Sequence, residues 1–182
     1  DLGGFDPKLP IFRDDIDFGW RANLAGHPVV VHPDAIVQHA EAAAHGRRRL
    51  GATRDRAHLV DRRNALYVLL ANAPARRVPF VFVRVILGGI GRALGFLLGK
   101  QPALAAEELL AVLAVVGRPD RLLTARRRRA RTRSVGQDDL RKLFPPAGQQ
   151  LRHAGETVLA LVSGTGSGYD LPGRSRAATG SD

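Results

Sequence analysis

Three carboxylates stand within four residues near the start of the sequence, at Asp14, Asp15 and Asp17. Carboxylates this close repel one another, so the cluster requires a compensating positive group or a proton. One explanation is structural, because acidic residues at a helix start are favoured by the helix dipole and can cap free N–H groups. The other is chemical, because a positioned carboxylate can remove a proton from a hydroxyl group as a general base. Taken alone, the three residues favour the structural explanation.

An arginine and a histidine extend this motif. Arg21 follows Asp17 by four residues, which in a helix places the two on one face and predicts an ion pair. His39 lies 24 residues beyond Asp15, just after a valine-rich segment. If the helix and strand between them fold back as an αβ unit, Asp15 and His39 face one cleft. A neutral imidazole there would suit a divalent metal ion.

Short elements must position these side chains. Residues 1–12 form a loop rich in Gly and Pro, and residues 13–25 are expected to form a short helix that ends at Gly26, a natural C-cap. The three valines at residues 29–31 predict a short strand, and residues 35–38 predict a second one. The expected unit is therefore a helix followed by strands.

The run GGFDPKLPIFRDDIDFGWRANLAGHPVVVHPDAIVQHA, residues 3–40, resembles the second half of the GT-A catalytic domain of family 2 glycosyltransferases. That family has a Gly-Gly-Phe-Asp loop and an acidic motif of the form Glu/Asp-Asp-x-Asp-Leu/Phe/Tyr-x-x-Arg. A Gly, a Val-rich strand, a Pro-Asp-Ala turn and a His follow. The likeness is greatest to actinobacterial galactofuranosyl- and rhamnosyl-transferases of cell-wall glycan assembly. It covers about residues 2–72, since residues 61–66 match the family's Arg-Asn-containing helix.

The resemblance implies a role for each residue of the motif. Asp15 matches the catalytic base of an inverting transfer, and Asp14 matches the acidic neighbour that contacts the acceptor or supports the base. His39 matches the metal-binding histidine, for which Mn²⁺ or Mg²⁺ would neutralise the leaving nucleotide diphosphate. Asp17 and Arg21 match structural members of the motif.

The resemblance also places three further residues on the acceptor side of the site: Gly3, Gly4 and Trp20. A lone aromatic residue on a helix is more often a core residue than a sugar platform, so Trp20 has two interpretations, of which the core position is the commoner. The acceptor would be a cell-envelope glycan or a lipid-linked sugar, and the donor a nucleotide sugar.

The family's Asp-x-Asp metal motif and nucleotide-binding half would lie before residue 1. The resemblance therefore implies a fragment that is inactive without that upstream half. Its fold class would be an α/β remnant, the second half of a GT-A domain, followed by a mainly helical, membrane-associated region. We expect three parts: residues 1–45 from the catalytic domain, residues 46–135 as a basic and apolar helical region, and residues 136–182 as weak helices and a linker.

Charge and hydropathy separate these parts. Residues 1–41 hold seven acidic and three basic residues, whereas residues 42–182 hold ten acidic and 25 basic ones. Apolar periodicity predicts a helix over residues 55–72, ended by Pro74, and another over residues 104–116. The chain contains no cysteine, which excludes disulfides and thiolate metal sites.

Residues 78–98 are the most apolar stretch and are long enough to span a bilayer. Arg84 and Arg92 interrupt it, and each would cost about 2.5–3.5 kcal/mol at mid-bilayer. We therefore expect an in-plane or re-entrant helix whose arginines reach lipid phosphates, at the cytoplasmic face of the cell membrane. A buried helix of a soluble domain is the alternative.

Residues 118–133 hold eight arginines and one aspartate, with the densest run at residues 126–133. Beside apolar helices, this cluster fits an anionic membrane surface. The runner-up function is a non-catalytic basic adaptor for anionic membrane or nucleic acid. No aromatic residue interleaves the run, which argues against nucleic acid. A solvated helix end would explain the same charges.

Overall fold

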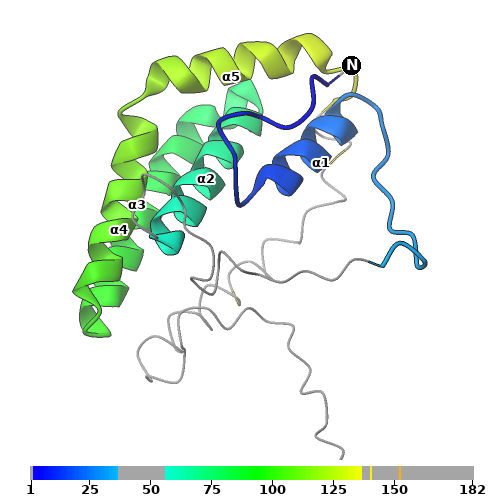
Figure 1. Cartoon of the computed structure of the whole chain (residues 1–182). Helices are drawn as coiled ribbons and strands as arrows, with labels where there is room; N and C mark the ends of the chain where they lie inside the picture. The colour runs from blue at the N-terminus through cyan, green and yellow to red at the C-terminus, as the bar shows by residue number, and fades with distance from the viewer. Residues whose placement is uncertain (1, 37–55, 137–139, 141–151, 153–182) are drawn as a thin grey trace, which may run out of the picture.

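The computed structural model describes residues 2–36, 56–136, 140 and 152 (Figure 1). Within these ranges the chain is helical. The elements are α1 (Asp14–Leu24), α2 (Ala57–Asn72), the short 3-10 helix η2 (Ala75–Arg77), α3 (Val78–Leu98), α4 (Pro102–Val116) and α5 (Pro119–Thr132). The helices expected over residues 13–25, 55–72 and 104–116 are therefore present, within two residues at each end.

The expected α/β remnant is wrong, because the described part of the chain contains no strand. Val30 and Val31, the last two residues of the expected first strand, are 78% and 98% exposed. A β-branched run becomes a strand only when a neighbour shares its hydrogen bonds and buries one face, and no described segment does this. Residues 35 and 36 of the expected second strand are not in a strand either, and residues 37–38 lie outside the described residues.

Helix α1 begins and ends as the sequence indicates. Its acidic residues occupy the first turn, where the helix dipole favours negative charge. At its end Gly26 adopts φ 83°, and the N–H of His27 donates to the carbonyl of Ala22 at 2.9 Å. This left-handed glycine closes the helix in the way that the sequence predicted.

Helices α2, α3 and α4 pack side by side, α3 along α4 and α4 against α2 (Figure 1). Prolines open both α4 and α5, at positions where a helix needs no N–H. Helix α5 then turns away and crosses one end of this bundle, in contact with α2 (Figure 1). Helix α1 lies on another side of α2.

One apolar core joins these helices to the N-terminal loop. Leu9 of the loop is buried in the same cluster as Leu66 and Leu70 of α2, Ala111 of α4 and Leu122 of α5. Helices α3 and α4 approach each other closely at Gly89, where an added Cβ would lie 2.5 Å from a methyl group of Val112. The core therefore fixes the N-terminal loop relative to α5, although the sequence separates them widely.

The face of α3 opposite its contact with α4 is apolar and exposed. Together with η2, α3 forms a helix over residues Ala75–Leu98 that is long and apolar enough to cross a membrane, by length and composition. Its most apolar 18-residue window is only 28% buried inside the protein. The large apolar side chains on its exposed face recur at helical spacing: Phe80, Val83, Leu87, Ile90, Leu94 and Leu97.

Candidate functional site

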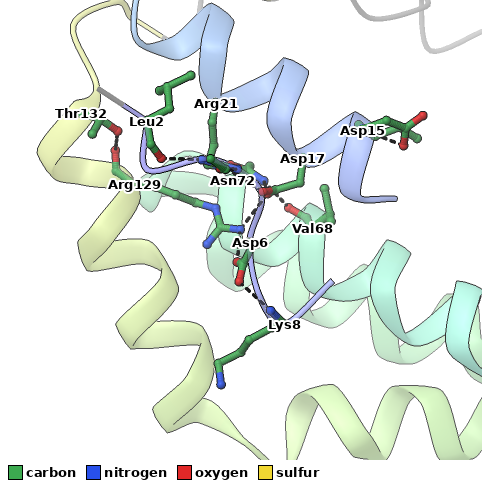
Figure 2. A network of polar contacts seen from close by, with 12 residues as sticks. Leu2, Asp6, Lys8, Asp15, Asp17, Arg21, Val68, Asn72, Arg129 and Thr132 are labelled. Carbon is green, nitrogen blue, oxygen red and sulfur yellow. Dashed lines mark hydrogen bonds and ion pairs between the residues drawn. The ribbon is translucent and has the colours of Figure 1, made fainter. Parts of the chain in front are cut away.

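Asp17 of the acidic motif is completely buried and lies at the centre of a polar network (Figure 2). Arg21 donates from Nε to its Oδ2 at 2.7 Å, which confirms the predicted ion pair one helical turn apart. Arg129 of α5 donates from Nη2 to Oδ1 at 2.7 Å, and Asn72 of α2 donates from Nδ2 to the same oxygen at 2.9 Å. Three helices therefore meet at one carboxylate.

A second carboxylate completes the network. The Nη2 of Arg129 also lies 2.9 Å from Oδ2 of Asp6, which accepts a hydrogen bond from the Tyr67 hydroxyl at 2.8 Å. Two guanidinium groups, of Arg21 and Arg129, thus face two carboxylates, so the buried charges balance. A buried charge is tolerated when it is paired and hydrogen-bonded in this manner.

The network shifts the ionisation of its members. Burial raises the pKa of Asp6, but hydrogen bonds from the Lys8 backbone and from Tyr67, with the charge of Arg129, outweigh it and hold the pKa below its usual value. Burial lowers the pKa of Arg129, but the hydrogen bond and the charge of Asp17, together with Tyr67, outweigh burial and raise the pKa. Burial and the neighbouring Asp6 raise the pKa of Tyr67 to about 12. All three groups therefore keep one charge state around neutral pH.

Gly3 and Gly4 shape the loop that Arg21 holds. Arg21 donates from Nη1 to the carbonyl of Leu2 at 3.0 Å and from Nη2 to the carbonyl of Gly4 at 2.7 Å. Both glycines adopt left-handed φ angles, of 67° and 74°, which side chains disfavour. Their observed role is to turn the backbone toward Arg21, and the acceptor contact assigned to them stays a prediction.

Asp15 lies apart from this network. It is exposed in the first turn of α1, and Figure 2 shows it turned away from Asp17. Its Oδ1 accepts the N–H of Ile16 at 2.8 Å, and Asp14 beside it is half-buried. Next to them Arg13 pairs with Asp61 of α2 through two hydrogen bonds of 2.7 and 2.8 Å. The motif therefore has an inward half that anchors α1 and an outward half that presents carboxylates.

Two predicted site residues remain, His39 and Trp20. His39 lies outside the described residues, so its approach to Asp15 and its metal role stay predictions. Among the described residues, no group of three or more His, Cys, Asp or Glu side chains gathers as a metal site would require. Trp20 is half-buried and packs against the main core, as the structural interpretation of this residue expects.

Helix α5 turns some arginines of its basic run into the protein and leaves others exposed. Arg129 is buried, so it is not available to a membrane or nucleic acid, and Arg126 is half-buried and donates from Nη1 to the carbonyl of Leu70 at 2.6 Å. Arg127, Arg128 and Arg131 are exposed. The sequence did carry a signal for this, because Leu122, Ala125 and Arg129 recur at helical spacing and face inward together.

A second buried cluster surrounds Glu108 of α4, which is 1% exposed. Arg62 Nε lies 2.9 Å from its Oε2, Arg92 Nε lies 3.2 Å from the same oxygen, and His58 Nε2 lies 3.6 Å from Oε1. Burial raises the pKa of Glu108 against the opposing charges of Arg92 and His58. Arg92 is thus paired inside the protein rather than extended toward lipid, whereas Arg84 is exposed on the apolar face of α3.

Comparison with known proteins finds no matching family model, no matching curated protein and no matching solved structure.

Proposed function

We propose that this chain forms the acceptor side of an inverting family 2 glycosyltransferase that works at a membrane surface, with Asp15 as the general base. The observation that supports this most is the division of the acidic motif. Asp17 and Arg21 are locked inside the protein, while Asp15 is exposed in the turn that they anchor. A rigid inner half and an accessible outer carboxylate are what a positioned base requires.

The chemistry assigned to Asp15 is a single proton transfer. In an inverting transfer the acceptor hydroxyl attacks the anomeric carbon in line with the leaving nucleotide diphosphate, and a carboxylate takes the hydroxyl proton. Asp14 stands beside Asp15 and can orient the same hydroxyl. Arg13 is fixed by Asp61 next to them, so the first turn of α1 is tied to α2.

A nucleotide-sugar donor and a divalent cation, Mn²⁺ or Mg²⁺, belong to the proposal through the family resemblance. Asp14 and Asp15 offer the carboxylate oxygens that such ions take. Among the described residues, however, no third ligand of that kind joins them. The proposal therefore assigns the metal to His39 and to a donor-binding half outside the described residues.

The exposed apolar face of α3 supports the membrane part of the proposal. A glycan or lipid-linked acceptor of the cell envelope is reached most directly by an enzyme held at the cytoplasmic membrane surface. The exposed apolar face of α3, with side chains such as Phe80 and Leu87 at 70% and 63% exposure, offers the contact. Burying such side chains in the lipid boundary is favourable by about 25 cal/mol per Å² of apolar surface.

The experiment is an Asp15→Asn substitution in the longest polypeptide that carries this chain. Transfer of labelled sugar to membrane glycolipids should fall by about 10²–10⁴-fold, because Asn keeps the shape and loses the basicity. Asp34→Asn is the charge-matched control, since Asp34 is exposed and stands outside the polar network. Equal transfer by wild type and Asp15→Asn would reject Asp15 as the base. The 182 residues alone should transfer no sugar.

A second candidate rests on α5. Its exposed Arg127, Arg128 and Arg131 would let a non-catalytic adaptor bind anionic membrane or nucleic acid. The two functions separate cleanly, because the adaptor retains its binding in Asp15→Asn and shows no transfer in any longer form. Duplex nucleic acid bound with a steep salt dependence would favour the adaptor, since phosphate contacts release counterions.

A further inference from the structure

Two adjoining cavities lie where the N-terminal loop meets α2 and the corner between α4 and α5. Their volumes are about 280 and 250 Å³, and they share Lys8, Tyr67, Arg118 and Arg121 as lining residues. Arg128 lines the first cavity and Arg63 the second. A single water needs only about 10–15 Å³ of such space, so a polyatomic ligand fits.

The lining carries five cationic side chains and two acidic ones, and both acids are already engaged. Asp6 is bonded to Arg129 and Tyr67, and Asp120 is paired with Arg118 at 3.2 Å. Within the described part of the chain, no hydrogen bond or ion pair ends on the side chains of Lys8, Arg121 or Arg128. The cavity walls therefore hold positive charge that no described side chain neutralises.

These positive charges repel one another, and a bound anion would remove this repulsion. Burial and the nearby guanidinium of Arg121 lower the pKa of Arg63, so these two arginines repel each other. The N-terminus of α5 begins at the same place, with Asp120 and Arg121 in its first turn, and adds its own positive potential. Like charges gathered around an open cavity are a feature of anion-binding sites rather than of stable cores.

The chemistry of the walls selects the class of anion. Guanidinium groups present paired N–H donors that match phosphate oxygens, and a lysine adds a point charge. We propose that these joined cavities, lined by Lys8, Arg63, Arg121 and Arg128, bind a phosphate or pyrophosphate group. The site does not depend on the transferase proposal, because it rests on the charges and shape of this corner alone.

The two possible sources of the phosphate are a soluble compound and a lipid headgroup. Helix α4 connects the cavity to an exposed apolar surface, since Ala114 and Val115 line the second cavity and the adjacent Leu113 is 64% exposed. A headgroup phosphate could enter from that side, while a soluble pyrophosphate could enter from the open mouth. Both carry the same oxygens to the same four cations.

The test is isothermal titration of the full chain with sodium pyrophosphate and with inorganic phosphate, at constant ionic strength. Arg121→Gln and Arg128→Gln should each weaken pyrophosphate binding by about three- to tenfold, as for partly exposed charge pairs. Arg127→Gln is the matched control, because Arg127 is the exposed neighbour of Arg128 on α5 and does not line either cavity. It should bind within twofold of wild type, a change smaller than about 0.5 kcal/mol.

Thermal unfolding separates binding from folding. Removing Arg121 relieves its repulsion of Arg63, so Arg121→Gln should unfold at the same temperature as wild type or higher, even though it binds less tightly. Equal losses in all three variants would show a diffuse basic field and overturn the site, as would the failure of pyrophosphate to bind at about 10 mM, a concentration above the roughly 1 mM Kd of a weak ligand. Vesicles that contain phosphatidic acid identify the source: competition with pyrophosphate assigns the site to a headgroup, and binding of pyrophosphate without competition assigns it to a soluble compound.

Discussion

Arg129 and Asp17 are 112 residues apart in the sequence, yet Nη2 of the arginine lies 2.7 Å from Oδ1 of the aspartate. This contact joins α5, the last helix described, to α1, the first. Both side chains are buried, with Asp17 at 0% and Arg129 at 5% exposure. The outward position of Asp15 therefore depends on an arginine at the far end of the helical region.

Replacing Arg129 by Gln should destabilise the fold strongly. The substitution leaves the buried carboxylates of Asp17 and Asp6 short of one cation, and removing one partner of a buried pair typically costs about 3–5 kcal/mol. The free energy of unfolding can be followed in urea by the fluorescence of Trp20, the only tryptophan. Arg127→Gln, at an exposed position on the same helix, should change it by less than about 0.5 kcal/mol. Equal stability of the two variants would show that the network contributes nothing.

Asp6 predicts how the same network responds to acid. Its pKa is lower in the folded chain than the ordinary 3.8, so the ionised form is favoured by folding. Its contribution to stability is present above about pH 3.8 and is lost as the pH falls through the folded pKa. Asp6→Asn should thus lower the melting temperature at pH 6, and the difference from wild type should shrink toward pH 3. The high net charge acts on both proteins alike, so a difference that grows on acidification would contradict the assignment.

The close approach of α3 and α4 can be tested with two neighbouring glycines. At Gly89 an added methyl group would lie 2.5 Å from Val112, whereas at Gly88 nothing lies within 4 Å. Gly89→Ala should destabilise the chain by about 1–3 kcal/mol, as overpacking of a core does. Gly88→Ala should stabilise it by about 0.5–1 kcal/mol, because Ala has the higher helix propensity. Urea unfolding of both variants measures this, and stabilisation by both substitutions would place the helices farther apart.

Local features of the structure were predictable from the sequence, because they depend on residues a few positions apart. The four-residue spacing of Asp17 and Arg21 predicted their ion pair, and Gly26 and Pro74 predicted where helices end. The expected strands failed for a related reason. A valine run at residues 29–31 favours extended backbone, but a strand also needs a partner, and a partner is a long-range property that three residues cannot indicate.

The long-range contacts of the polar network were not predictable from the sequence. Arg129 stood among seven other arginines in residues 118–133, and nothing in its type marked it as the partner of Asp17. The sequence places Asp6 only in a loop and Asn72 only at the end of a helix, although both bond to this network. The predicted meeting of Asp15 and His39 concerns a residue outside the described ones and stays a prediction.

The exposed apolar face of α3 predicts that the protein binds to a membrane surface. Leu87 and Leu94 are 63% and 56% exposed, two turns apart on this face, and Leu123 on α5 is 53% exposed. A double substitution Leu87→Asn and Leu94→Asn should weaken binding to anionic vesicles by about tenfold or more, because each leucine forgoes roughly 1 kcal/mol of apolar burial. Leu123→Asn is the control and should bind as wild type does. Co-sedimentation measures both, and raising the salt concentration should leave a bound fraction in wild type that the double variant lacks, since salt screens charges and not apolar contact.

Melting temperatures should stay within a few degrees of wild type, because these side chains are outside the core. If no form binds vesicles and wild type instead self-associates through this face, light scattering will show the dimer, and the assignment of α3 to a lipid surface will be wrong.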